Sequence, residues 1–450
     1  MNLTDFIEFA LAKMACRTND REPTGPSSPS PGFLLGHDPV THSPVHLHLK
    51  DRRKHLYVVG ASGCGKTNLL LRLLDDDVNE NRNAIVIDLR GDLVDRVIKR
   101  LAPERINGNQ IHLLDFRNEV HAVPFNPLVG PGNAYRRALH LLEIIKESSP
   151  SWGVQLEETI RFCLIALAES HGSILDVELL LTDGGFRSKV LGKCRDEQTL
   201  RFFARFSRLS PSQQTTLTLP VLNKLSPFWS VPHIRQTLSS RQSLEWGEWI
   251  DRKGHIVLIA LAAHSYPGLA QTIGGLIVAS IQEAVMARAD QPQGSRVPIT
   301  LYLDEFETMA TPTFSTIIAE GRRFGLSLLL AHQNIAQIES RLRQTILGNV
   351  QTSLYFQCSA HDATQLARDI VTPIQPNVLR QKLSSSPVGV AFLNRRGKPS
   401  TIVATFHEPD PELSEDELRE RKHILQIQKK FVPRKALNRQ EVRHERRPFI

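Results

Sequence analysis

Cysteines are few in this 450-residue chain, and none of them is paired as Cys-x-x-Cys. A disulfide framework or a cysteine-ligated zinc site requires paired or clustered cysteines, so the sequence disfavours both. Scattered thiols in odd number instead favour a reducing cytoplasm. The five positions are Cys16, Cys64, Cys163, Cys194 and Cys358.

The sequence also lacks a continuous apolar run of the roughly 18–20 residues that a membrane span needs. The apolar region near the N-terminus is interrupted by Asp5, Glu8 and Lys13, unlike the uncharged core of a secretory signal peptide. We therefore expect no transmembrane segment, and a cytoplasmic location that is at most peripheral to a membrane complex.

Composition otherwise excludes little. Hydrophobic residues make up 41% of the chain and charged residues 23%, which is ordinary for a globular protein. The net charge of +8 permits a polyanionic partner without establishing one. His46 and His48 share one face of a strand pattern, but no carboxylate or cysteine completes a ligand set there, so a metal site is disfavoured.

The strongest local pattern follows the apolar run at residues 56–59 and precedes a helical pattern at residues 68–74. A P-loop requires this strand–loop–helix context, in which glycines let backbone N–H groups converge on phosphate oxygens. The pattern therefore predicts that the chain binds a nucleoside triphosphate. Its residues are Gly60, Ala61, Ser62, Gly63, Cys64, Gly65, Lys66 and Thr67. We expect Lys66 to reach the β- and γ-phosphates and the Thr67 hydroxyl to ligate Mg²⁺.

Two adjacent carboxylates, Asp304 and Glu305, end the buried-strand pattern at residues 299–303. In P-loop NTPases an acid at a strand end holds the hydrated Mg²⁺, and a neighbouring glutamate polarises the attacking water. The alternative is a pair of acids in an ordinary turn. Because the strand pattern at residues 83–88 intervenes, the acids need not follow the strand next to the P-loop strand. Such an order is expected of ATPases with a catalytic glutamate, rather than of simple kinases and GTPases.

Three further polar residues flank the strand pattern that begins at residue 326. Gln333 ends that strand, where its amide is placed to sense the γ-phosphate or orient water, or simply caps the strand. Arg322 and Arg323 precede the strand. One of them could act as a finger that stabilises transition-state charge in a neighbouring site, with a solvated surface charge as the alternative.

Apolar runs that alternate with helical periods predict an α/β fold, in which a mostly parallel sheet is flanked by helices. Within it, residues 131–245 show helical spacing and no strand pattern, which indicates an all-helical insertion. The predicted organisation is an N-terminal helix with a Pro/Ser-rich linker (1–32), a P-loop core in two parts (33–130 and 246–408), the insertion (131–245) and a charged helix with a basic tail (409–450).

Six segments together resemble the HerA/FtsK superfamily, within it the type IV coupling proteins and their soluble TraG/TraD-like relatives. The segments read HLYVVGASGCGKT, VIDLRGDL, VLNKLSPFWSVPHIRQTL, LYLDEFETM, EGRRFGLSLLLAHQNIAQI and ILGNVQTSLYFQCSAHDATQLARDI. They stand in family order, and the resemblance covers roughly residues 33–408. The resemblance implies a RecA-like core of the ASCE kind of P-loop NTPase, and a hexameric ring that pumps DNA through a central pore.

The resemblance also implies residue roles. Lys66 and Thr67 would act at the phosphates and Mg²⁺, Asp304 and Glu305 as metal acid and catalytic base, and Gln333 as sensor. In coupling proteins the trans-acting finger is the first arginine of a G-R-[KR]-x-G segment, eleven positions before the sensor glutamine. Arg322 fits that position.

The chain departs from the family in three ways. Membrane-anchored coupling proteins begin with transmembrane helices, which are not expected here. HerA proteins carry a sizeable N-terminal β-barrel, whereas only about thirty residues separate the linker from the P-loop in this chain. Many soluble relatives read D-P-H-G-D where this chain has residues 88–92, DLRGD, so a role of that proline–histidine pair does not carry over.

From these features we expect an ATP-driven, ring-forming DNA translocase that uses ATP and Mg²⁺. It would bind double- or single-stranded DNA and work with a nuclease, a relaxase or a secretion machinery. One alternative is a protein-secretion or assembly ATPase of the same superfamily. Another is a nucleotide-gated scaffold for an effector nuclease, which the intact Glu305 disfavours.

Overall fold

The structure is a computed structural model, and it describes residues 32–427 except 121, 131, 148, 150, 241–243, 311, 371–373 and 399. The chain divides into two compact units. The first comprises Met1–Ala84, Pro298–Glu307 and Ile318–Pro411, and the second Ile85–Val297, Thr308–Ile317 and Glu412–Ile450. The predicted N-terminal helix and the basic tail lie outside the described residues, as does all but the last residue of the linker.

The strands of the first unit pair in the order β2-β1-β11-β10-β9-β3-β8-β7. Strands β9, β3, β8 and β7 are mutually parallel, whereas the pairings from β2 to β9 are antiparallel. The bounds are β1 Phe33–His37, β2 Pro44–Leu47, β3 Leu56–Val59, β7 Ile299–Leu303, β8 Leu326–His332, β9 Thr352–Tyr355, β10 Val390–Arg395 and β11 Thr401–Thr405. Every residue of β3 and β8 is buried, as apolar runs without alternation predict for central parallel strands.

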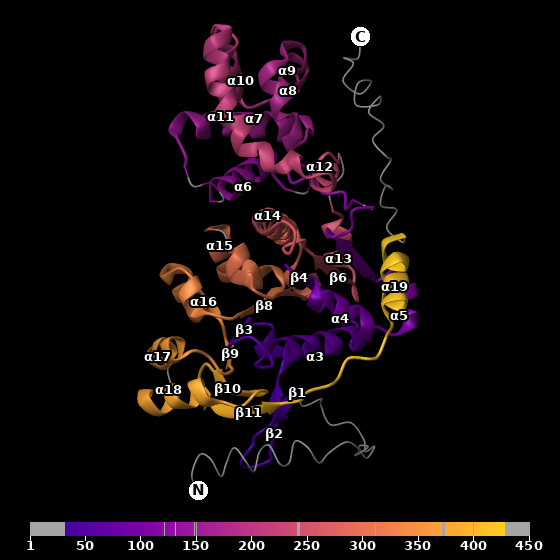
Figure 1. Cartoon of the computed structure of the whole chain (residues 1–450), viewed down its shortest axis with the longest axis vertical. Coiled ribbons are helices and arrows are strands. Elements are labelled where there is room, and N and C mark those ends of the chain that lie inside the picture. The colour runs from indigo at the N-terminus through magenta and orange to yellow at the C-terminus, as the bar shows by residue number, and fades with distance from the viewer. Residues whose placement is uncertain are drawn as a thin grey trace. The chain divides into compact units, whose positions relative to one another are not determined.

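Helices of the first unit are α2 Leu49–Arg52, α3 Lys66–Asn79, α16 Ser340–Asn349, α17 Ala360–Asp369 and α18 Pro376–Ser385, with short 3₁₀ turns η5 Gly321–Phe324 and η6 Ile335–Gln337. Figure 1 labels α3, α16, α17 and α18. Helix α3 buries its leucines and is tied at its far end by an ion pair. There Arg52 lies 2.6 Å from Asp77, which also accepts a 2.6 Å hydrogen bond from the Tyr302 hydroxyl. Both ends of α3 are therefore attached to the strands that carry the candidate site.

In the second unit three strands pair in the order β4-β6-β5, with β5 and β6 parallel. Their bounds are β4 Asn83–Asp88, β5 Ile111–Asp115 and β6 Ile256–Ala260. The nearby helices are α4 Asp92–Arg100, α5 Pro103–Asn107, α13 Trp246–Asp251, α14 Pro267–Met286 and α19 Glu415–Ile427, with 3₁₀ turns η2 Ala287–Asp290 and η3 Gln293–Ser295. Two short elements, η4 Phe306–Met309 and α15 Pro312–Glu320, belong partly to each unit.

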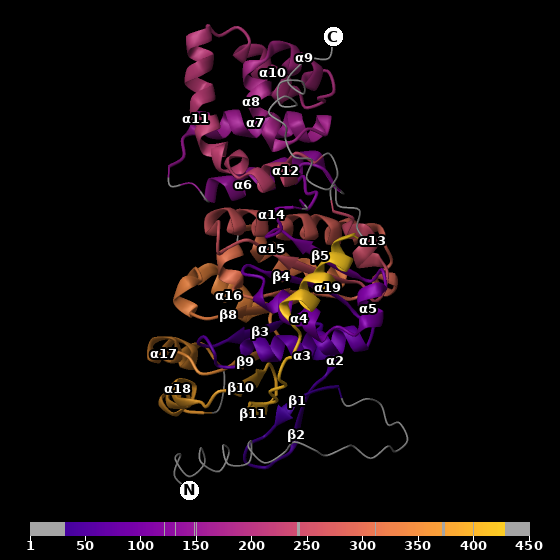
Figure 2. The same ribbon diagram turned by 45° about the vertical axis from the view of Figure 1, so that its right-hand side comes forward.

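The part of the second unit for which an all-helical insertion was predicted contains helices (Figure 2). They are α6 Ala134–Glu147, α7 Val154–Ser170, η1 Ile174–Asp176, α8 Val177–Thr182, α9 Gly184–Leu191, α10 Glu197–Phe206, α11 Pro211–Ser230 and α12 Pro232–Leu238. On α7 the apolar residues Ile160, Cys163, Leu164 and Leu167 are fully buried, as their helical spacing predicts.

Helix α19 is attached to α4 by charged side chains. The Arg421 guanidinium donates to the backbone carbonyls of Ile98 (3.1 Å) and Leu101 (2.9 Å), and Lys422 lies 2.8 Å from Asp95. A cation at the C-terminal end of α4 satisfies carbonyls that the helix itself leaves without partners. These contacts hold helix α19 against α4.

Helix α14 with η2, residues Pro267–Asp290, is long and apolar enough to cross a membrane by length and composition alone. In the structure 78% of its apolar window is buried inside the protein, as in the central helix of a folded core.

With strands flanked by helices throughout, the predicted α/β fold class is confirmed.

Candidate nucleotide-binding site

The predicted P-loop connects the end of β3 to the start of α3. Gly63 has a φ of 75° and Gly65 a φ of 113°, a left-handed region that other residues rarely adopt. The N–H of Ala61 donates to the carbonyl of Gln357 at 2.7 Å, which anchors the loop to the segment after β9. The sequence thus supplies glycine at the turns that the loop requires.

Lys66 is the first residue of α3 and is buried, with 6% of its surface exposed. Its ammonium donates to the carbonyls of Gly60 at 2.6 Å and Ala61 at 2.9 Å, so the charge lies within the curve of the loop. Thr67 follows on the first helical turn. A buried cation, a helix N-terminus and glycine-rich backbone suit phosphate oxygens, so the residues present fit a bound nucleotide.

The carboxylates Asp304 and Glu305 follow β7, and β8 lies between β7 and the P-loop strand β3. The prediction that the acids need not follow the strand next to the P-loop strand is confirmed. The intervening strand is β8, whose end carries Gln333, and not β4 at residues 83–88. Parallel β3, β7 and β8 bring their C-terminal ends, and hence these polar residues, to one edge of the sheet.

Glu305 and Gln333 are in direct contact. The Gln333 amide Nε2 donates to Oε1 of Glu305 at 2.9 Å. Glu305 itself has a φ of 51°, an uncommon conformation for a residue other than glycine, and its N–H donates to Oδ1 of Asp304 at 3.1 Å. A strained backbone held by side-chain contacts is typical of functional sites.

Arg322 lies in the 3₁₀ turn η5 and is exposed. Its Nη1 atom is 3.5 Å from the carbonyl of Asn349, at the end of α16. The structure therefore brings Lys66 into the loop and Glu305 to Gln333, but presents Arg322 at the surface of its own chain.

A third carboxylate, Glu307, was not singled out from the sequence. Burial raises its pKa to about 7, and the charges of Glu305 and Asp304 add to this effect, whereas Lys66 opposes it. The pattern Asp-Glu-x-Glu at residues 304–307 was a readable signal of a third acid. The burial of Glu307 could not be predicted from this pattern, because it depends on the packing of η4.

Replacing Glu307 by glutamine should stabilise the protein at pH 8 and have little effect at pH 4.5. Since the folded-state pKa is raised, the stability contribution of the protonated acid is complete below the ordinary value of 4.5 and is lost as the pH rises through about 7. We expect a gain of about 1–2 kcal/mol at pH 8, discounted for partial exposure. Denaturant titration at both pH values measures it, with the exposed Glu320→Gln as control. An equal shift at both pH values would contradict the prediction.

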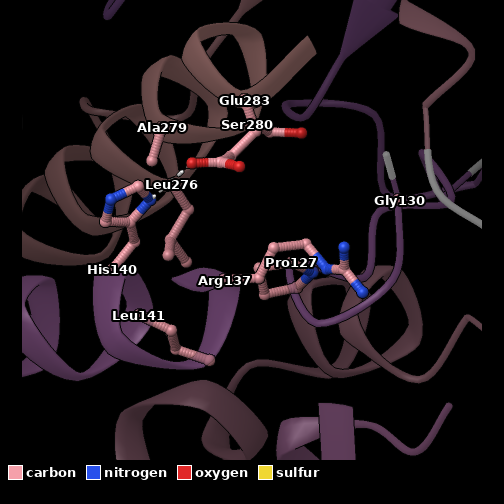
Figure 3. A pocket seen from close by; sticks show the side chains of 9 residues that line it. All are labelled: Pro127, Gly130, Arg137, His140, Leu141, Leu276, Ala279, Ser280 and Glu283. Atoms are coloured by element: carbon pink, nitrogen blue, oxygen red, sulfur yellow. Dashed lines mark ion pairs between the residues drawn. The ribbon is translucent and has the colours of Figure 1, made fainter. Parts of the chain in front are cut away.

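A pocket in the second unit lies between α6 and α14 and contains about 330 Å³ of space, part of it open to solvent (Figure 3). Glu283 is 3% exposed there, and burial raises its pKa; Oε1 lies 3.6 Å from Nδ1 of His140. Arg137 donates to the carbonyl of Leu128 at 3.0 Å, which holds the segment before α6. The pocket contains none of the residues predicted for the site.

Two family models match parts of the chain. One, described as the TraM recognition site of TraD and TraG, matches residues 298–370; the other, described as the type IV secretion-system coupling protein DNA-binding domain, matches residues 39–128. The chain is similar to the type IV coupling proteins. The second match contains the P-loop, and the first contains Asp304, Glu305, Arg322 and Gln333. The resemblance to coupling proteins that the sequence predicted is confirmed.

Solved structures share the fold of this coupling-protein-like chain. An unbound form of the bacterial conjugative coupling protein TrwBdeltaN70 is 13% identical, with a TM-score of 0.61 over 86% of this chain and 91% of that one. Plasmid coupling protein TrwB in complex with ADP and Mg²⁺ is 14% identical, with a TM-score of 0.59 over 82% and 89%. VirB4 of Thermoanaerobacter pseudethanolicus is 12% identical, with a TM-score of 0.59 over 86% and 99%. No curated protein sequence matches the chain at a significant level.

Proposed function

We propose that this chain is an ATP-hydrolysing, ring-forming motor of the HerA/FtsK type that moves DNA through a central pore, as expected of a conjugative coupling protein. The observation that carries the proposal is the contact between Glu305 and Gln333, beside a P-loop whose lysine is already turned into the loop. A structural turn needs neither a strained glutamate nor an amide that holds its carboxylate.

We propose the following roles for the residues of the site. Lys66 and the backbone N–H groups of the P-loop would bind the phosphates, and the Thr67 hydroxyl and the Asp304 carboxylate would hold Mg²⁺. When bound, Mg²⁺ neutralises charge on the phosphate oxygens. Glu305 accepts the proton of the attacking water, and the amide of Gln333 keeps that carboxylate oriented. TrwB, a structure with the same fold, was solved in complex with ADP and Mg²⁺.

A ring is supported by the position of Arg322. Because its guanidinium is exposed, its charge is available to the site of a neighbouring subunit. We propose a homo-oligomer, a hexameric ring, in which each site is completed by the next subunit's finger. An isolated monomer would then hydrolyse ATP slowly.

The cargo is proposed to be DNA, single- or double-stranded, because residues 39–128 match a model described as a DNA-binding domain. The match over residues 298–370 to a recognition site for TraM supports partners of the relaxosome kind, such as a relaxase or a nuclease, or a secretion machinery. We place the motor in the cytoplasm, beside a membrane-embedded complex.

A second candidate is a protein-secretion ATPase, since VirB4 shares the fold with the same TM-score as ADP-bound TrwB. The fold alone therefore does not determine whether the cargo is DNA or protein. A nucleotide-gated scaffold is the third candidate, and it would bind ATP with negligible turnover.

DNA should stimulate ATP hydrolysis several-fold at low salt, and the stimulation should fall steeply as salt is raised, because phosphate contacts release counterions. The measurement is steady-state turnover with double-stranded DNA, single-stranded DNA or neither, at low and moderate salt. Robust hydrolysis that is indifferent to DNA would favour the protein-handling ATPase. Tight ATP binding without turnover would favour the scaffold.

A further inference from the structure

Three buried rings lie beneath the candidate site. The hydroxyl of Tyr57 is 2.6 Å from Nε2 of His332, and the two rings stack with centroids 5.2 Å apart. Phe306 meets His332 edge-on at 5.3 Å and Tyr57 at 6.5 Å. All three are almost fully buried, with at most 1% of their surface exposed.

The strand register explains why these rings meet. Val59 of β3 is paired with His332 of β8, so Tyr57, two residues earlier on the same face, lies diagonally across from His332. In the chain, each ring is close to a residue of the site. Tyr57 precedes Gly60 by three residues, His332 precedes Gln333 directly, and Phe306 follows Glu305 directly.

Burial lowers the pKa of His332 to about 3, so its ring is neutral at working pH, and burial raises the pKa of Tyr57 well above its ordinary value. The hydrogen bond therefore joins two uncharged groups, and the imidazole tautomer decides which of them donates. Such a bond in a dry environment is costly to leave unmade.

His332, the last residue of β8, and Gln333, which follows it, contact two consecutive residues of the turn after β7. His332 contacts the ring of Phe306, while Gln333 donates to Glu305. The backbone of Glu305, at a φ of 51°, needs such support, because a side chain in the left-handed region costs roughly 1–2 kcal/mol. The hydrogen bond between Tyr57 and His332 connects the P-loop strand β3 to the contact between His332 and Phe306.

We propose that Tyr57 and His332 are positioning residues, which hold Phe306 and thereby fix the turn that presents Glu305 beside Gln333. The proposal rests on the function proposed above, in which Glu305 acts in ATP hydrolysis. It assigns a task to a tyrosine and a histidine that no sequence pattern singled out.

The test is Tyr57→Phe in the full-length chain, which keeps the ring and deletes the hydroxyl. We expect the single-turnover rate of ATP hydrolysis to fall about tenfold, within the roughly 100-fold that small misplacements cost. The affinity for a fluorescent non-hydrolysable ATP analogue should not change. Tyr302→Phe is the matched control, because it deletes another buried hydroxyl, one bonded to Asp77; its rate should stay within about twofold of wild type.

A second comparison separates positioning from loss of structure. In a Glu305→Gln background, Tyr57→Phe should leave the residual rate unchanged, because no base remains to be positioned. His332→Phe and the double variant Tyr57→Phe/His332→Phe should each match Tyr57→Phe, since both residues act through one bond.

The outcomes are distinct. A Tyr57→Phe rate equal to wild type, or an equal fall with and without Glu305, would overturn the positioning proposal and leave the ATPase intact. A wild-type chain no faster than Glu305→Gln would overturn the proposed function, and the positioning proposal with it.

Discussion

Replacing Glu305 by glutamine should lower ATP turnover by about 10²–10⁴-fold, the range that general base catalysis contributes. Glutamine has the shape of glutamate, and its amide oxygen still accepts the hydrogen bond that Gln333 donates at 2.9 Å. It cannot accept a proton from water. The geometry of the turn is therefore kept while the chemistry is removed.

The experiment compares wild type, Glu305→Gln and Glu320→Gln in steady-state turnover and in ATP binding. Glu320 is an exposed glutamate before η5, and its replacement controls for the loss of one negative charge. Binding should be preserved in both variants. Turnover near the wild-type level in Glu305→Gln would show that this carboxylate is not the base.

Replacing Arg322 by alanine should lower turnover of the assembled ring by about 10³–10⁵-fold, as expected of an arginine finger. Because Arg322 is exposed on its own chain, its loss should not disturb the P-loop, and nucleotide affinity should be kept. Arg323→Ala, one residue along the same 3₁₀ turn, is the matched variant and should retain activity.

Mixing the two inactive variants tests whether the finger acts between subunits. In a mixed ring an Arg322→Ala subunit keeps its Glu305, and its neighbour, a Glu305→Gln subunit, supplies the intact arginine. Activity should therefore reappear on mixing, although neither variant is active alone. Mixed rings that stay inactive, in a sample whose assembly is verified by light scattering, would contradict a finger in trans.

Local patterns determined much of the nucleotide site. The P-loop is a strand, a glycine-rich turn and the start of a helix, all within residues 56–79, so its conformation depends on neighbours in the sequence. Gly63 and Gly65 adopt a left-handed backbone, which glycine permits. The acids at residues 304 and 305 were equally visible, because a buried strand must end where charged side chains begin.

The division of the chain into sheet-forming and helical stretches was also readable from periodicity. Helix α7 shows its apolar stripe in the sequence, and β8 its continuous apolar run. Both elements can be predicted without knowing what they pack against, because the spacing of apolar residues reflects the type of element in which they lie.

Contacts between strands were decided by the tertiary structure alone. That β8 lies between β3 and β7 is a choice of strand order, and it is this order that places Gln333 against Glu305. Tyr57 and His332 are 275 residues apart in the chain, and no local spacing connects them. The raised pKa of Glu307 likewise reflects burial. Local sequence patterns therefore identified functional side chains of the nucleotide site. The proximity, orientation and protonation of these side chains arise only when distant strands pack together.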